Sequence, residues 1–174
     1  MSRPPTVAAR RRGVLTVGVT GHRSIPDEAY PLVRGELAAE LGNAARRSDT
    51  VEALSSLAVG ADQLFAELAL ECGARLTAVS PGADYEATFA PEELAGYHRL
   101  LWRAHAHVRL DFPVVDDDAY YAAGAYIAEH SDLVLAVWDG LPARGRGGTG
   151  DMVAYARSLG KTVVVIWQAG VRRP

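Results

Sequence analysis

Several segments of this chain are apolar at nearly every position, and they constrain the fold more than any other feature. The clearest is LVLAVW at 133–138, and VLTVGV at 14–19 and TVVVIW at 162–167 are similar. Strands that are apolar on both faces belong to parallel sheets covered by helices on both sides. Shorter runs predict further strands at 51–57, 75–79 and 107–110.

Helix-like patterns separate these runs. In the first of them Val33, Leu37 and Leu41 repeat every four residues. The expected helices are 27–47, 61–72, 91–104, 117–130 and 149–159. Alternating strands and helices predict an α/β fold, which we expect to be a single doubly wound domain. It should have a mostly parallel sheet of about six strands with helices on both faces.

Length, charge and cysteine content narrow the class of protein. The 174 residues suit one domain, expected at 13–170 after a flexible N-terminal arm at 1–12. The net charge of −3 comes without a basic stripe, so we expect no nucleic-acid partner. A lone cysteine, Cys72, favours a reducing compartment, and no apolar run approaches the ~18 residues of a membrane span. We therefore expect a cytoplasmic protein without a membrane partner.

Polar or glycine-rich stretches follow four of the expected strands. The carboxyl ends of parallel strands share one edge of a sheet, and ligands bind there at a topological switch point. These stretches should therefore meet at one site. The candidate ligand-binding residues are Thr20, Gly21, His22, Arg23, Gly60, Ala61, Asp62, Ser80, Asp139, Gly140, Gly147, Gly148 and Thr149.

The individual roles follow from side-chain chemistry. Arg23 is expected to make charge-assisted contacts with an anion. Gly21 and Gly60 would let a ligand approach the backbone, since they lack a Cβ atom. Either Asp62 or Asp139 would contact ribose hydroxyl groups. The role of His22 stays open, because it could either contact the ligand or support its loop. Asp62 could also be an ordinary acidic residue in the first turn of a helix.

The stretch GGTGD at 147–151 is the strongest candidate for a phosphate site. Thr149 can cap the helix that follows, and the free N–H groups and dipole at a helix start attract phosphate. Arg144 and Arg146 add positive charge nearby. The alternative is an ordinary glycine-rich loop with a threonine cap.

Two familiar motifs and a metal site are not supported by this sequence. The spacing of Gly145, Gly147 and Gly150 fits a dinucleotide fingerprint, but no acidic residue follows about 20 residues later. The stretch 140–147 begins like a P-loop and lacks its lysine and serine or threonine. His105 and His107 have no third ligand nearby, so we expect no metal and no cofactor.

Four stretches together resemble the SLOG superfamily, over about residues 13–168. They are the strand followed by Gly-His-Arg (21–23), LAVGAD at 57–62, SDLVLAVWDG at 131–140 and GGTGDMVAYA at 147–156. This superfamily has Rossmann-like domains. It includes nucleoside monophosphate phosphoribohydrolases of the LOG type, Smf DNA-processing proteins and nucleotide-sensing domains. The resemblance implies a Rossmann-like fold and nucleotide binding.

Details of the resemblance separate the activities within the superfamily. Gly148-Thr149 matches a Gly-Thr of the phosphoribohydrolases, and Asp151 falls where those enzymes carry an acidic residue. Their preceding Pro-Gly-Gly is replaced by Arg-Gly-Arg at 144–146, and their catalytic arginine has no clear counterpart. The TGHR stretch at 20–23 is closer to the sensor-type members.

Three hypotheses about function follow. In the first, the protein binds a nucleoside monophosphate, a cyclic nucleotide or an ADP-ribose derivative as a sensor or carrier. In the second, it is a phosphoribohydrolase-like N-glycoside hydrolase acting on nucleoside 5′-monophosphates, with Asp151 as the catalytic residue and preorganised charge stabilising the transition state. In the third, it is a dimeric interaction module with a vestigial pocket. A homodimer or higher homo-oligomer is expected in each case.

Overall fold

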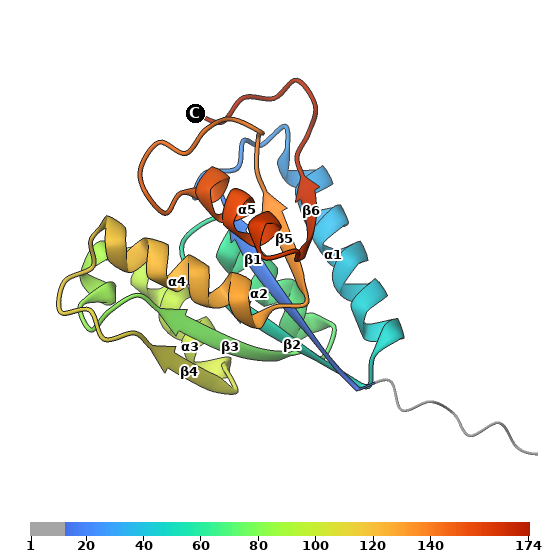
Figure 1. The fold of residues 1–174 in the computed structure, drawn as a ribbon, viewed down its shortest axis with the longest axis horizontal. Helices are drawn as coiled ribbons and strands as arrows, with labels where there is room; N and C mark the ends of the chain where they lie inside the picture. Colours follow the sequence, from blue (N-terminus) through green and yellow to red (C-terminus); the bar gives the residue numbers. More distant parts are fainter. Residues whose placement is uncertain (1–12) are drawn as a thin grey trace, which may run out of the picture.

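A computed structural model describes residues 13–174, and the arm expected at 1–12 lies outside the described residues. The described residues form a six-stranded sheet in the order β4-β3-β2-β1-β5-β6 (Figure 1). Every neighbouring pair is parallel, so the sheet is wholly rather than mostly parallel. The strands are β1 Val14–Gly21, β2 Thr50–Ser55, β3 Arg75–Ser80, β4 Ala106–Arg109, β5 Leu133–Val137 and β6 Thr162–Ile166.

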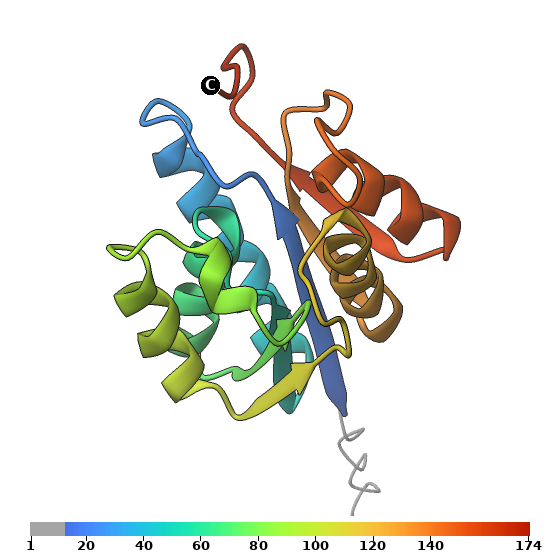
Figure 2. The ribbon, with the colours of Figure 1, turned by 90° about the vertical axis from the view of Figure 1, so that its left-hand side faces the viewer.

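Helices cover both faces of the sheet, as expected for a doubly wound fold (Figure 2). The first three helices lie on one face and the last two on the other. They are α1 Tyr30–Arg47, α2 Ala61–Glu71, α3 Leu94–Arg103, α4 Asp117–His130 and α5 Thr149–Ser158. A short 3₁₀ helix at Tyr85–Thr88 lies in the loop after β3. Among residues 13–174, no helix combines the length and apolar character that crossing a bilayer requires.

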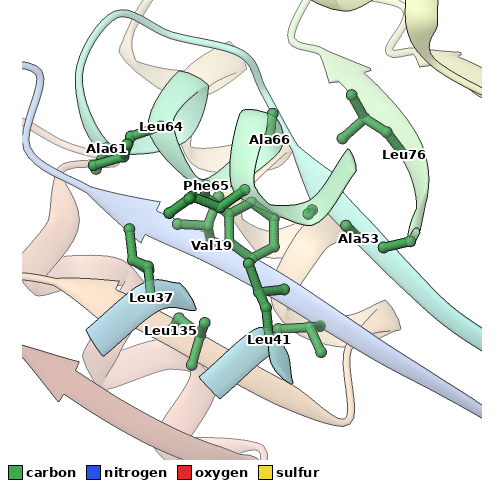
Figure 3. Close-up of a cluster of buried hydrophobic side chains, with 14 of the residues drawn as sticks. Val19, Leu37, Leu41, Ala53, Ala61, Leu64, Phe65, Ala66, Leu76 and Leu135 are labelled. Atoms are coloured by element: carbon green, nitrogen blue, oxygen red, sulfur yellow. The ribbon is translucent and has the colours of Figure 1, made fainter. Parts of the chain in front are cut away.

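The main core lies between the sheet and the first helices (Figure 3). The apolar repeat of α1 places Leu37 and Leu41 against it, and both are fully buried. Phe65 of α2 and Leu135 of β5 are also fully buried there. Each such side chain contributes about 1.5–3 kcal/mol of burial free energy. The core therefore fixes the central strands that carry the loops of interest.

The first helix begins later than the sequence pattern indicates. The helix was expected to start at residue 27, but the N-cap is Ala29, and the helix starts at Tyr30. The backbone N–H groups of Ala29 and Tyr30 both donate to the carbonyl of Pro26, which forms a tight turn before the helix. The turn uses the residues that would otherwise have extended the helix.

The strand order creates a crevice between β1 and β5. The chain leaves β1 toward α1 on one face and leaves β5 toward α5 on the other. Gly21 and Val137 pair at the carboxyl ends of these two strands. Ligands of open α/β sheets bind at such a switch point, because the diverging connections leave room there.

Candidate functional site

A cavity of about 410 Å³ opens at the carboxyl ends of β1 and β5. This volume falls within the range typical of small-molecule sites. Eight of the residues expected from the sequence line it, and they come from the end of β1 and the loop after it, the first turn of α2, and the loop before α5 with the first residue of that helix. They are Thr20, Gly21, His22, Arg23, Asp62, Gly147, Gly148 and Thr149.

The other expected residues do not line this cavity. Gly60 and Ala61 lie behind the loop that follows β1, and Gly140 is exposed to solvent. Ser80 is buried, with its hydroxyl group 2.6 Å from Nε2 of His107. Asp139 lies behind His22 and acts on the cavity through that side chain.

Positive charge dominates the cavity wall. Arg23, Arg144, Arg146 and Arg173 line it, and Asp62 is the one acidic residue among the described residues that do so. Arginine binds phosphate and carboxylate through a planar fork of donors. This distribution of charge makes the cavity suited to an anion.

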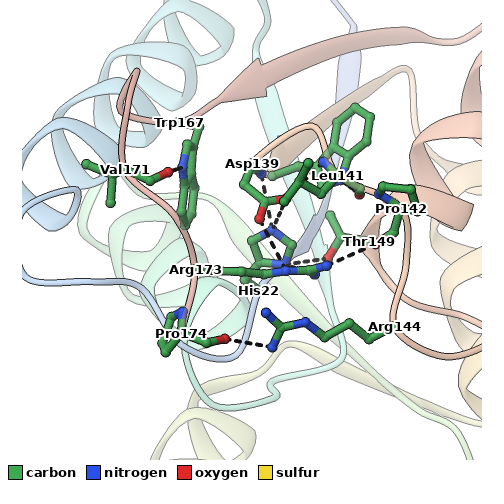
Figure 4. Close-up of polar contacts among 11 residues, drawn as sticks. His22, Asp139, Leu141, Pro142, Arg144, Thr149, Trp167, Val171, Arg173 and Pro174 are labelled. Carbon is green, nitrogen blue, oxygen red and sulfur yellow. Dashed lines mark hydrogen bonds and ion pairs between the residues drawn. The ribbon is translucent and has the colours of Figure 1, made fainter.

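His22 is held in the wall by a polar network (Figure 4). Its Nε2 atom lies 3.1 Å from Oδ1 of Asp139. Its Nδ1 atom lies 3.4 Å from both the Thr149 hydroxyl and Nη1 of Arg173. Nε2 also accepts the backbone N–H of Asp139 at 3.1 Å. The indole of Trp167 packs edge-on against the ring, with centroids 5.3 Å apart.

The network keeps the imidazole neutral and the carboxylate charged. Burial lowers the pKa of His22 below its usual 6.5, and Arg173 and Arg144 lower it further, against the opposing effect of Asp139. Burial acts to raise the pKa of Asp139. That effect is outweighed by the backbone N–H of Leu141 and by His22 and Arg173, which hold the pKa below 3.8. His22 therefore adds no positive charge to the cavity wall at neutral pH.

Two expected ligand-contact glycines serve packing between elements. A Cβ atom at Gly60, whose φ is +92°, would lie 2.3 Å from the carbonyl oxygen of Arg23. A Cβ atom at Gly21 would lie 2.4 Å from Cβ of Ala61. The N–H of Ala61 donates to the carbonyl of His22 at 3.1 Å. The Gly60-Ala61 step thus supports the loop that carries His22 and Arg23.

Some backbone N–H groups of the glycine-rich loop before α5 already donate hydrogen bonds within the loop. The N–H of Gly147 donates to Oδ2 of Asp151 at 3.0 Å, and the N–H of Gly148 donates to the carbonyl of Gly145 at 3.2 Å. Asp151, expected as a catalytic residue, instead closes this loop and does not line the cavity. Thr149 is buried at the start of α5, where the first N–H groups of a helix have no partner within the helix.

Asp62 and Arg23 form a second polar group in the cavity wall. Burial raises the pKa of Asp62 from 3.8 to about 7, although the N–H of Ala58 and the charge of Arg23 act to lower it. Arg23 donates to the hydroxyl of Tyr120 at 3.3 Å, and its guanidinium lies 5.5 Å from the centre of that ring. Near neutral pH the Asp62 carboxyl is therefore able both to donate and to accept a proton.

Arg173, Tyr85 and Tyr120 line the cavity but were absent from the expected set. The Tyr120 ring packs against the core while its hydroxyl faces Arg23. Tyr85 lies in the 3₁₀ helix of an irregular stretch without periodicity. Arg173 lies beyond the expected end of the domain at residue 170. In residues 13–174, no cluster of three or more His, Cys, Asp or Glu side chains is arranged to hold a metal.

No protein-family model and no curated protein sequence matches this chain. Solved structures do resemble it. DNA processing protein A from Helicobacter pylori superposes with a TM-score of 0.62 and 16% identity, over 87% of this chain and 64% of that one. DNA processing protein A from Streptococcus pneumoniae gives 0.61 and 19%, over 87% and 50%. The molybdenum cofactor carrier protein from Chlamydomonas reinhardtii gives 0.51 and 17%, over 89% and 76%.

These likenesses show the fold. The chain has a Rossmann-like α/β fold with a six-stranded parallel sheet and helices on both faces, as the sequence predicts, and the neighbours of similar fold fit the SLOG resemblance of its motifs. It spans half to two thirds of the length of the two DNA processing proteins.

The expectation that nucleic acid is excluded as a partner class is wrong. The Helicobacter pylori protein, which shares this fold, has a described single-stranded DNA binding mode. The expectation was based on a net charge of −3, which averages over the whole surface. Local charge decides phosphate binding, and four arginines meet at this cavity.

Proposed function

We propose that the protein binds a phosphate-bearing, nucleotide-derived ligand in the cavity between β1 and β5, as a sensor or carrier. The observation that carries the proposal is the set of four arginines around a cavity at the switch point of the sheet. Asp139 and Asp118 pair with Arg173 and Arg146. This leaves Arg23 and Arg144 without an Asp or Glu carboxylate within ion-pair distance among the described residues. An anion compensates them and makes charge-assisted hydrogen bonds.

The phosphate is assigned to the start of α5. Thr149, the first residue of α5, offers its hydroxyl group, and the first turn of the helix offers backbone N–H groups that have no partner within the helix. Arg144 and Arg173 line the same cavity. The apolar side chains of Val19, Ile127 and others line the same cavity and suit a planar base. The Arg23 and Asp62 group would contact the sugar or the base. A molybdenum cofactor carrier protein among the structures of similar fold supports a small-molecule ligand.

N-glycoside hydrolysis is the second candidate, and one observation favours it. Asp62 lines the cavity with a pKa raised to about 7, which is the range that suits a general acid or base at neutral pH. In this version Asp62 takes the catalytic role, since Asp151 is hydrogen-bonded to Gly147 and lies outside the cavity.

Binding is tested by thermal shift and calorimetry with AMP, GMP, CMP, UMP, cyclic AMP, ADP-ribose and a single-stranded oligothymidine. A ligand at 100 times its Kd adds about 2.7 kcal/mol of stability, or roughly 5–10 °C for a chain of this size. Free base is measured by chromatography in the same samples. Arg23→Ala should weaken a nucleotide by about 10- to 100-fold, since one charge-assisted bond is lost.

Arg103→Ala is the matched control, since this exposed arginine ends α3 and does not line the cavity. Base release that Asp62→Asn abolishes would establish the hydrolase in place of the sensor. A response to the oligothymidine alone would assign the arginines to a nucleic-acid backbone. No response to any of these compounds refutes the proposal.

A further inference from the structure

The segment after β6, residues 168–174, turns back over the carboxyl edge of the sheet (Figure 4). The indole N–H of Trp167 donates to the carbonyl of Val171 at 2.7 Å, and the N–H of Val171 donates to the carbonyl of Gln168 at 3.2 Å. The Val171 side chain packs against the main core. These contacts form a fixed turn, and the turn brings Arg173 to the cavity.

Within the described residues, one nitrogen of the Arg173 guanidinium is held by a hydrogen bond and a second lies in an ion pair that lacks hydrogen-bond geometry. Nη2 donates to the carbonyl of Pro142 at 2.9 Å, and Nε lies 3.2 Å from Oδ2 of Asp139. The side chain is 12% exposed. The third nitrogen, Nη1, lies toward His22 on the cavity side.

The donors that meet at His22 are only loosely satisfied. Nη1 of Arg173 and the Thr149 hydroxyl both approach Nδ1 of His22 at 3.4 Å, which is long for a hydrogen bond. A single ring nitrogen cannot form a good hydrogen bond with both groups at once. An anionic oxygen placed between them would accept from each at a shorter distance and with a favourable charge.

We propose that Arg173 is an anion-binding residue, carried into the site by the segment after β6 and held there by Asp139. Its Nη1 and the Thr149 hydroxyl donate to a phosphate oxygen of the ligand. This inference rests on the proposed function and adds to it, because it assigns part of the phosphate site to a segment outside the α/β repeat. Asp139 and His22 then act as positioning residues rather than as ligand contacts.

The alternative is that Arg173 only ties down its segment, and two measurements separate the roles. The first is the ratio of the affinities for AMP and adenosine, which differ by the phosphate alone. Loss of an arginine–phosphate contact lowers this ratio. A general loosening of the site instead lowers the affinities for both compounds by the same factor. The second is hydrogen–deuterium exchange of residues 168–174, which reports whether the turn is formed.

The experiment compares the wild type with Arg173→Ala, Arg173→Lys and Arg172→Ala by calorimetry. Arg172 is the matched control, because it is the exposed neighbour in the same segment and does not line the cavity. Arg173→Ala should lower AMP affinity by at least about 10-fold with little change for adenosine, and Arg172→Ala should change neither. Arg173→Lys keeps the charge but loses the fork, so AMP should still bind more weakly than to the wild type.

Three outcomes would overturn the inference. If Arg173→Ala binds AMP as tightly as the wild type does, Arg173 is not an anion-binding residue, and the proposed function is unaffected. An equal loss for AMP and adenosine, with faster exchange across 168–174, would show a purely structural role. If the wild type binds neither AMP nor inorganic phosphate, this inference fails, and the proposed function fails with it only if no other compound of the binding panel responds.

Discussion

Replacing Asp62 by asparagine should stabilise the protein at alkaline pH. The carboxyl group is buried in the cavity wall, and this burial is the main cause of its raised pKa. Asparagine has nearly the same shape, and its side-chain oxygen still accepts the N–H of Ala58 that helps to hold the carboxylate. The substitution therefore removes the cost of a buried charge with little loss of packing.

The sign and size of the effect follow from proton linkage. The pKa of Asp62 is raised from 3.8 to about 7, so between these values the native state holds a proton that the unfolded state has released. Wild-type stability due to this group therefore falls as pH rises through this interval and is constant above it. The pKa difference corresponds to about 4 kcal/mol at pH 8, which is a ceiling for the gain in Asp62→Asn.

Urea unfolding at a series of pH values between 4 and 8 measures the gain. The difference between the variant and the wild type is the quantity to follow, because His22 contributes an opposite slope. Its pKa is lowered from 6.5, so its contribution to stability decreases as pH falls below that value. Asp27→Asn, at an exposed carboxylate before α1, is the control for a general charge effect.

The stability difference for Asp62→Asn should be small near pH 4 and should grow up to about pH 7. A difference that stays constant over this range would refute the reasoning, because the Asp62 carboxyl would then titrate alike in both states. If Asp27→Asn raises the free energy of unfolding by the same amount, the effect is due to net charge.

Three further substitutions test the loops around the cavity. Gly60→Ala should cost at least about 2 kcal/mol in urea unfolding, because of its positive φ and the clash with the Arg23 carbonyl, whereas Gly35→Ala in α1, where a Cβ meets nothing, should be neutral or stabilising. Asp151→Ala should cost about 1 kcal/mol through the lost bond from Gly147 and should leave any base release intact. Asp139→Asn should weaken AMP binding by about 10-fold and lower the pKa of His22 further, as measured by NMR titration.

The strands could be predicted because a strand that is buried on both faces is apolar at nearly every position of its sequence. All five residues of β5 are buried, and its segment is apolar throughout. The parallel topology then placed the loops after β1, β2 and β5 at one edge, and residues from all three line the cavity. Helix starts were less predictable. The turn that delays α1 depends on the carbonyl of Pro26, and backbone carbonyls have no residue-specific signal.

The glycines show why individual site roles did not follow from the sequence. A glycine is required wherever a Cβ atom has no room, and the sequence does not say which neighbour takes that room. At Gly21 the neighbour is Ala61 of α2, and at Gly60 it is the backbone of Arg23. Packing between elements therefore produced the same signal as a ligand approach.

The charges that line the cavity say more about the ligand than the net charge of the chain does. The net charge of −3 results from acidic residues spread over the surface, such as Glu71, which pairs with Arg34 away from the cavity. Arg173 reaches the cavity through a turn held by a Trp167 indole and a backbone carbonyl, which no periodicity reveals. Such a side chain raises the electrostatic potential inside the site, but it changes the net charge of the chain by only one unit. The class of ligand is therefore better inferred from the charges that meet at the end of β1 than from the sum over the chain.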